Sequence, residues 1–331
     1  MKIRRFFYFV AVVSVMIGLV MSPSANGVTF PGNNGKVAFV KNNHIWTLTL
    51  EGEQRFLVSG ANPAWSPDGK KLAFVGQDGH IWTIKAQGNR VRQVTYGNKY
   101  KDSEPVWTKD GTALAFVRQE RWGEQRSAIM RVSIDKQKVD TVSGWGAYRS
   151  PSWSPDGQAL AYEGYGDAEH ELIVKNLRTN QEVLLTRLSE NVESHVSWSP
   201  TGEKLLFNDS RNEVYTIWPD GSHRTVLSDG DSYHASWSPD GKRVAFIEDP
   251  ADDHISISEE DGTVVWVPIE KGVYRSMGAP LWSPDGTAVI FTMSLEKDGK
   301  AITDTFLLRL DSHTLVKLAD EALHEATWQA R

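Results

Sequence analysis

The chain has 331 residues, no cysteine and a formal net charge of −6, with 36 Lys and Arg against 42 Asp and Glu. A net acidic chain lacks the basic footprint that a nucleic-acid-binding platform needs, so we expect no nucleic-acid partner. The absence of cysteine excludes a disulfide framework and a lipid-modified cysteine anchor, and the length suits one large all-β domain.

Residues 1–27 have the layout of a signal peptide. Small residues suited to cleavage stand at 25–27, after an apolar run over 6–21 that follows three cations, Lys2, Arg4 and Arg5. The run is shorter than the ~20 residues of a spanning helix, and an uncleaved N-terminal anchor is the alternative. Removing this carboxylate-free leader would take the net charge from −6 to −9. We expect an extracytoplasmic protein (secreted, periplasmic or at the cell surface) that meets a membrane only through this segment, if it is uncleaved.

One motif then returns throughout the chain. Its most complete copy reads PAWSPDGKKLAF at residues 63–74, and five further copies occupy residues 105–116, 151–162, 196–207, 235–246 and 280–291. In every copy the Trp and the closing aromatic residue are nine positions apart. Successive motif Trp residues are 42, 46, 45, 39 and 45 positions apart. A period of roughly 40–45 residues is typical of a propeller blade.

Each repeat is expected to fold into four antiparallel strands. The apolar approach to the Trp is the first strand, Ser-Pro-Asp-Gly is a tight turn, and the run that ends in the aromatic residue is the second strand. Third and fourth strands follow, for example at residues 80–84 and 92–95, or at 213–217 and 224–227. Four strands per repeat make one blade of a propeller.

The two ends of the chain decide the number of blades. Residues 30–39 keep the aromatic spacing with a degraded turn, and residues 326–328 open a motif whose remainder is absent. The second strand therefore occurs seven times, which predicts an all-β, seven-bladed propeller of four-stranded antiparallel blades over residues 28–331, with six or eight blades as alternatives. We expect the strand at Trp328 to pair with the blade that begins at Lys36, because ring closure removes an exposed sheet edge. The Phe30 segment is the alternative for that place.

The repeated W-S-P-D-G-x-x-L-A-F unit, followed by a strand like I-W-T, resembles the TolB-like propeller repeat, a relative of the WD-repeat propeller. The resemblance covers about residues 30–331. It is specific for the fold and not for the function, because the same repeat occurs in the propeller domains of prolyl-oligopeptidase-type enzymes. We find neither the α/β domain that precedes the propeller in TolB nor a hydrolase domain with its Gly-x-Ser-x-Gly elbow. The resemblance therefore implies an exported propeller, and neither a Tol-system role nor peptidase activity can be carried over from it.

Binding residues are expected on one face of the ring. The turns between first and second strands are short and uniform, whereas the loops between second and third strands and between blades vary in length. We call the side with the variable loops the loop face, because binding sites usually lie on variable loops of a rigid scaffold. In the third and fourth blades this face interleaves aromatic residues with arginine, which is typical of a recognition patch: Tyr100, Arg121, Trp122, Arg126, Trp145, Tyr148 and Arg149, with Lys99, Lys101 and Arg118 in the same segments. The alternative is that these side chains only pack and solubilise long loops.

A second set of candidates lies three residues before each motif Trp. These positions are at the start of the innermost strands, so their side chains should surround the mouth of the central channel. Ionisable residues occupy four of these positions, Glu104, His195, His234 and Glu325. They could bind a metal or act as acid and base, whereas the plainer interpretation is a water-filled polar mouth. The candidate metal ligands are His195, His234, Asp229 and Asp231. No cofactor is expected, and Ca²⁺ or a transition metal is the alternative.

The favoured function is a non-enzymatic binding module, most simply a monomer, which holds a protein, peptide or glycan on its loop face. The alternative is a propeller enzyme, a polysaccharide lyase or hydrolase that uses the channel mouth. We favour binding because the residues that repeat are structural and no catalytic set has a recognisable spacing. The motif Trp residues are expected in the core, and His44, His80 and His254 are expected to be edge or loop residues at the start of third strands.

Overall fold

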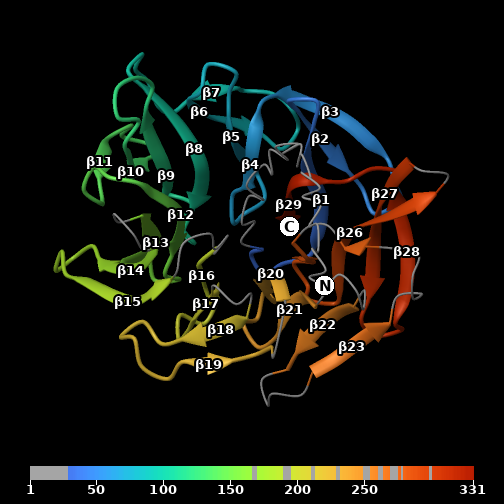
Figure 1. The fold of residues 1–331 in the computed structure, drawn as a ribbon. Helices are drawn as coiled ribbons and strands as arrows, with labels where there is room; N and C mark the ends of the chain where they lie inside the picture. Colours follow the sequence, from blue (N-terminus) through green and yellow to red (C-terminus); the bar gives the residue numbers. More distant parts are fainter. Residues whose placement is uncertain are drawn as a thin grey trace, which may run out of the picture.

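The computed structural model describes residues 29–165, 170–188, 195–209, 213–228, 232–248, 254–259, 264–268, 275–276, 279–297 and 300–331. The predicted signal peptide, Asp229 and Asp231 lie outside this part. The described strands form seven sheets arranged around a common axis (Figure 1), which confirms the predicted all-β, seven-bladed propeller. Within the described ranges, no helix is long and apolar enough to cross a membrane.

Every blade is an antiparallel sheet whose strands follow each other outward from the axis. Blades 1 to 3 consist of β29 (His324–Ala330), β1 (Asn34–Lys41), β2 (His44–Leu48) and β3 (Gln54–Ser59); β4 (Ala61–Trp65), β5 (Lys71–Val75), β6 (Ile81–Lys85) and β7 (Arg92–Gln93); and β8 (Tyr100–Trp107), β9 (Ala113–Glu120), β10 (Ser127–Ser133) and β11 (Val139–Thr141). Blades 4 and 5 consist of β12 (Tyr148–Trp153), β13 (Ala159–Tyr165), β14 (His170–Asn176) and β15 (Glu182–Leu188); and β16 (Ser197–Trp198), β17 (Leu205–Asn208), β18 (Val214–Ile217) and β19 (Thr225–Val226).

Blades 6 and 7 consist of β20 (Ser232–Trp237), β21 (Val244–Glu248), β22 (His254–Ser258) and β23 (Val264–Pro268); and β24 (Arg275–Ser276), β25 (Leu281–Trp282), β26 (Ala288–Lys297), β27 (Lys300–Arg309) and β28 (Thr314–Ala319). The innermost strand of blade 7 is in two pieces, because β24 and β25 both pair with β26. Blade 7 therefore still has four strand positions, the innermost of which is shared by β24 and β25.

Blade 1 combines strands from both ends of the chain. β29 pairs antiparallel with β1, so that Trp328 lies opposite Val37 and Thr327 lies opposite Ala38. The Trp328 side chain is only 1% exposed and belongs to the core between blades 7 and 1. The predicted closure by the C-terminal strand is confirmed. Phe30, the alternative, lies outside the strands and packs against the core of blades 2 and 3.

The Ser-Pro-Asp-Gly motif recurs because its side chains build the turn. The Ser66 hydroxyl donates to Asp68 at 2.7 Å, the backbone N–H of Lys71 donates to Ser66 Oγ at 2.9 Å, and Gly69 adopts a φ of +62°. The hydroxyl–Asp bond recurs at 2.5–2.7 Å in four other copies, at Asp110, Asp156, Asp240 and Asp285. Local bonds of this kind favour a turn over a strand, so these carboxylates serve the fold.

The motif Trp residues tie neighbouring blades together. In four blades the indole N–H donates to the backbone carbonyl that precedes the Trp of the previous blade, at 2.9–3.3 Å: Trp107 to Ala64, Trp153 to Val106, Trp237 to Ser197 and Trp282 to Ser236. The pattern changes in the other three blades. Trp328 donates to Gly35 of its own blade, and the buried indole nitrogens of Trp65 and Trp198 have no acceptor. Because buried indole N–H groups are normally paired, these three joints are held mainly by other contacts.

Candidate functional site

The residues expected at the channel mouth lie at irregularities of the inner strands. Pairing between the first and second strands shifts register around these positions in blades 2, 3, 4 and 6. Their backbones adopt the left-handed conformation, with φ of 45–55°, at Asn62, Glu104, Ser150, His234 and Glu325. Such β-bulges redirect a side chain out of the regular pleat, and non-glycine residues rarely adopt this conformation elsewhere.

Side chains at these bulges join one blade to the next. The Glu325 carboxylate accepts the backbone N–H of Asn62, the Asn62 side-chain oxygen accepts that of Glu104 at 3.5 Å, and the Glu104 carboxylate accepts that of Ser150 at 2.7 Å. Burial raises the pKa of both Glu104 and Glu325, although these hydrogen bonds oppose the shift. The carboxylates therefore act first as bridges between the inner strands of blades 1 to 4.

A buried ion pair continues this series into blade 4. Arg149 of β12 lies opposite Glu163 of β13, and its Nε is 2.9 Å from Glu163 Oε2. Glu163 is 0% exposed, its Oε1 has no hydrogen-bond partner, and it accepts the backbone N–H of Val196 in blade 5. Burial raises the pKa of Glu163 to about 7, because the nearby charge of Arg149 offsets only part of the desolvation. At the same repeat position blades 1, 2, 3 and 6 carry apolar residues, Val40, Val75, Val117 and Ile247, whereas blades 5 and 7 carry the uncharged polar residues Asn208 and Thr292.

The Glu163→Gln variant tests this burial. A native pKa of about 7, above the ordinary value of 4.5 for a Glu side chain, means that the contribution of Glu163 to stability is full below pH 4.5 and is lost as pH rises through 7. The free energy of unfolding of the wild type should therefore fall, relative to that of the variant, by on the order of 3 kcal/mol between about pH 5 and pH 8. Urea denaturation at several pH values measures the difference. The exposed Glu124→Gln variant is the control, and parallel pH profiles for wild type and Glu163→Gln would contradict the prediction.

Two of the predicted patch residues meet in a stack. The rings of Tyr100 and Trp145 are 5.4 Å apart between centroids and inclined by 28°. The guanidinium of Arg118 lies 5.3 Å from the Tyr100 centroid and 5.3 Å from the Phe116 centroid. Exposure increases outward from the buried Phe116 to Trp145, which is 37% exposed. The solvent-exposed Trp145 therefore stacks on Tyr100, which in turn contacts the buried Arg118 and, through it, Phe116.

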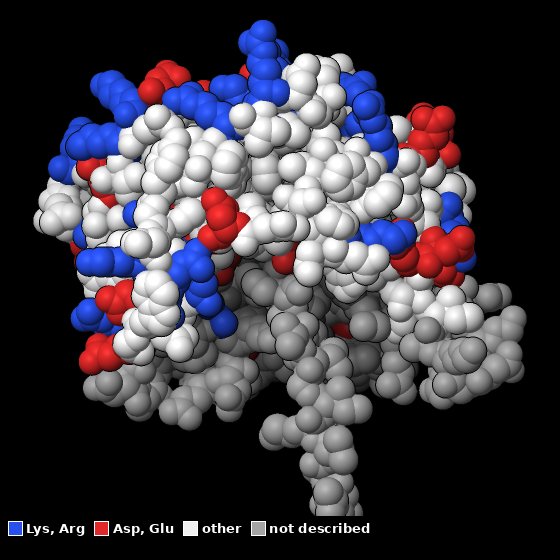
Figure 2. Space-filling view, turned by 90° about the horizontal axis from the view of Figure 1, so that it is seen from above, with Lys and Arg blue, Asp and Glu red and all other residues white. Residues whose placement is uncertain are grey.

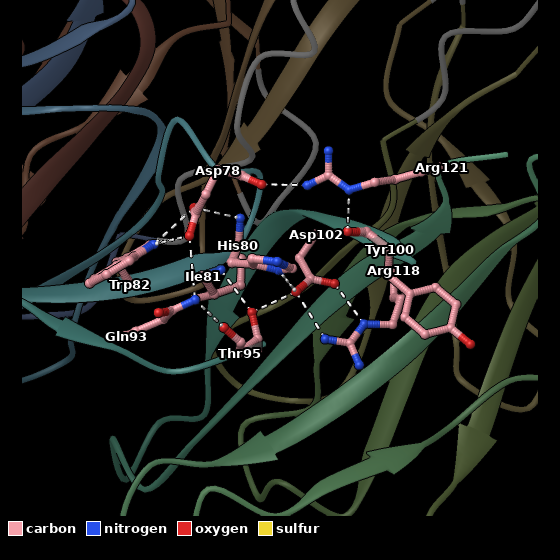
Figure 3. A network of polar contacts seen from close by, with 10 residues as sticks. All are labelled: Asp78, His80, Ile81, Trp82, Gln93, Thr95, Tyr100, Asp102, Arg118 and Arg121. Carbon is pink, nitrogen blue, oxygen red and sulfur yellow. Dashed lines mark hydrogen bonds and ion pairs between the residues drawn. The ribbon is translucent and has the colours of Figure 1, made fainter. Parts of the chain in front are cut away.

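Arg118 is itself held by a polar network between blades 2 and 3 (Figure 3). Its Nε and a terminal nitrogen donate to the two oxygens of Asp102 at 2.7 and 3.0 Å. The Thr95 hydroxyl also donates to Asp102, and His80 Nδ1 lies 3.3 Å from the same carboxylate. His80 lies in the loop just before β6 (Ile81–Lys85), as predicted, but it is only 7% exposed and contacts Asp102 of the next blade.

The remaining patch residues divide into two groups. Arg121 donates to the backbone carbonyl of Tyr100 at 2.7 Å and to that of Asp78, so it joins blades 2 and 3 (Figure 3). Tyr148 packs edge-on against Tyr162 at 5.6 Å, and burial raises its pKa. By contrast, Trp122 is 69% exposed, and Arg126 forms surface ion pairs with Glu120 and Glu124 at 3.0 and 3.4 Å. Trp122 and Trp145 are therefore the patch residues best presented to a ligand.

The described residues contain no cluster of side chains that would support the predicted metal site. Among them, no group of three or more His, Asp or Glu side chains could hold a metal ion. His195 and His234 are half-buried in blades 5 and 6, and Asp229 and Asp231 lie outside the described ranges. Sequence reasoning missed Glu163 and Asp102. A charged residue directly after the closing aromatic, where every other repeat has an uncharged residue, is a signal that could have found Glu163.

The fold and this face define a seven-bladed β-propeller with one side of tight turns and one side of variable loops. The chain belongs to the family whose model is described as the TolB beta propeller domain, which matches residues 12–207. An uncharacterized protein of Agrobacterium fabrum is 29% identical to it over 150 residues, which is 40% of this chain and 50% of that protein. The chain thus spans about half the length of this curated relative.

Solved structures share the fold at low identity. TolB from Acinetobacter baumannii has a TM-score of 0.56 and 17% identity, covering 91% of this chain and 68% of its own. Puromycin hydrolase has a TM-score of 0.69 and 16% identity, covering 92% and 55%. Oligogalacturonate lyase in complex with manganese has a TM-score of 0.63 and 15% identity, covering 89% and 86%. The same propeller therefore occurs both in TolB and in enzymes, and the likeness shows the fold alone.

Proposed function

We propose that this protein is an extracytoplasmic, non-enzymatic binding module that holds a protein, peptide or glycan ligand on the loop face of blades 3 and 4. The observation that carries this proposal is the outward-facing Trp145, stacked on Tyr100 above the buried Arg118, with Trp122 exposed on a loop of the same face. The signal-peptide layout of residues 1–27 supports the location outside the cytoplasm.

The support beneath Trp145 suits binding, because a ring that is already fixed loses little conformational entropy when a ligand covers it. Asp102 holds Arg118 with two hydrogen bonds, and Arg118 in turn lies against Tyr100. Trp and Tyr side chains offer large apolar contact areas and dominate binding energies at interfaces. The exposed Lys99 and Lys101 on the same loops favour a ligand that combines a flat apolar face with negative charge.

The alternative function is a lyase or hydrolase that acts at the channel mouth. It is favoured by the neighbouring carboxyl groups of Glu104 and Glu163, because a carboxyl group that titrates near neutral pH suits acid–base catalysis. However, Glu163 is fully buried and its Oε2 is held by Arg149. A catalytic group must reach its substrate, so we place the binding function first.

Replacing the exposed tryptophans tests the binding surface. In Trp122→Ala and Trp145→Ala, affinity for ligands found in a peptide and glycan screen should fall at least about tenfold, the effect of losing ~1.4 kcal/mol of contact. Thermal unfolding should stay close to that of the wild type for Trp122→Ala, because this side chain is 69% exposed. Trp218→Ala, which removes a 42% exposed ring from the turn side of blade 5, is the matched control.

Unchanged binding of every screened ligand by both variants would contradict the proposed surface. Turnover of a polysaccharide that is lost in Glu104→Gln, and kept in Trp122→Ala, would favour the enzyme instead.

A further inference from the structure

Charge is unevenly distributed around the ring. Residues 60–147, which include blades 2 and 3, contain fourteen Lys and Arg and nine Asp and Glu, a balance of +5. Residues 195–323, which include blades 5 to 7, contain eleven Lys and Arg and twenty-two Asp and Glu, a balance of −11. A chain with an overall charge of −6 thus has one strongly basic sector, which gives the molecule an electrical polarity across the disc.

Much of this positive charge lies opposite the loop face. The turns of blades 2 and 3 that join first to second strands and third to fourth strands, with the strand ends beside them, carry seven cations, which we call the basic turn face: Lys70, Arg90, Lys109, Lys136 and Lys138 in the turns, Lys85 at the end of β6 and Arg92 at the start of β7. The same turns also carry three carboxylates, Asp68, Asp110 and Asp135. Lys and Arg side chains gather along the upper edge of the surface in Figure 2. Within the described part of the chain, only Lys70 and Lys138 of the seven form ion pairs, with Asp68 at 3.6 Å and Asp140 at 2.8 Å.

The basic turn face is continuous and built from short turns. A Cβ atom on Gly111 would lie 3.7 Å from Pro67, so the motif turns of blades 2 and 3 are in contact. The side chain of Gln137 donates to the backbone carbonyl of Gln93 at 3.1 Å, which joins the outer hairpin of blade 3 to blade 2. The cations therefore stand on a rigid base. At one hairpin, Val91 is 51% exposed between Arg90 and Arg92.

We propose that the basic turn face docks the protein on a lipid bilayer that contains anionic phospholipids. An anionic bilayer attracts every Lys and Arg held close to its plane, and cations on adjoining short turns can approach that plane together. Val91 suits the same surface, because an apolar side chain enters the headgroup region while flanking arginines meet the phosphates.

The acidic blades 5 to 7 would be repelled by the same surface, which orients the disc. The loop face lies on the other side of the ring and stays free for its ligand. This contact does not depend on the proposed ligand site, and it is distinct from insertion of the N-terminal segment.

Vesicle binding tests the proposal with the protein expressed with its own residues 1–27 and purified without detergent. Binding to phosphatidylcholine vesicles that contain phosphatidylglycerol should exceed binding to pure phosphatidylcholine vesicles, and high salt should remove the difference. The Arg90→Glu/Arg92→Glu/Lys109→Glu variant should bind the anionic vesicles at least about a hundredfold more weakly, since several surface cations act together. The Val91→Ser variant should bind several-fold more weakly.

The matched control is Arg178→Glu/Lys242→Glu/Arg309→Glu, which makes the same charge change at exposed positions on the turn side of blades 4, 6 and 7. It should change binding less than about threefold, because its sites lie outside the basic sector. Equal losses in the two triple variants would overturn the proposal, since they would show an effect of net charge alone. Equal binding to neutral and anionic vesicles would overturn it too, as would binding of a soluble acidic polysaccharide without any binding of vesicles.

Discussion

A chain that ends at Leu323, and so lacks β29, is expected to lose cooperative unfolding and to aggregate. The deletion opens the ring, because β29 is the innermost strand of blade 1 and pairs with β1. It removes the buried Trp328 and the hydrogen bond that the backbone N–H of Asn62 donates to the Glu325 carboxylate. It also exposes the unpaired edge of β1. Loss of a buried Trp alone costs about 3–5 kcal/mol, a large part of the ~5–15 kcal/mol that stabilises a typical protein.

Gel filtration and thermal denaturation by circular dichroism measure this effect. A synthetic peptide of residues 322–331 added in trans should restore a cooperative transition, because it supplies the same strand. The Trp328→Ala variant should lie between wild type and deletion, whereas Trp218→Ala should be close to wild type. A monomeric deletion variant with an unchanged melting temperature would show that the ring does not depend on closure by β29.

The Arg118→Met variant is expected to destabilise the protein by about 3–5 kcal/mol, because it leaves the buried Asp102 carboxylate without its cation. The Asp102 side chain is 0% exposed, so water cannot replace the lost partner. Urea denaturation measures the loss. The matched control is Arg126→Met, which breaks a surface pair with Glu120 and should cost less than ~1 kcal/mol.

A double variant, Arg118→Met with Asp102→Asn, separates an ion pair from simple packing. It should be less destabilised than the sum of the two single variants, since neither leaves an unpaired charge when the other is present. Additive losses, or a loss below 1 kcal/mol in Arg118→Met, would contradict the role given to this pair. In the proposed function, Arg118→Met should also weaken ligand binding, because Tyr100 and Trp145 rest on its guanidinium.

The repeated motif specifies those features of the fold that depend on neighbouring residues in the chain. The Ser-Pro-Asp-Gly turns, the nine-residue spacing from Trp to aromatic and the partial motif at Trp328 together predicted seven blades and their closure. Turn chemistry and strand alternation act over a few residues, so they can be read without knowledge of the fold. The sequence placed Tyr100 and Trp145 in one patch on the loop face, and the structure added that their rings stack.

Sequence by itself therefore determined the class of fold and the face with variable loops, and it favoured seven blades closed by the strand at Trp328, which the structure confirmed. Only the tertiary structure decided what the polar residues do: Arg121 binds backbone carbonyls, His80 is buried beside Asp102, and the fully buried Glu163 pairs with Arg149. These contacts join different strands and blades, and in a repeat every blade has nearly the same pattern. The repeat therefore encodes where a residue stands in its own blade, whereas its partner is set by the neighbouring blade that packs against it.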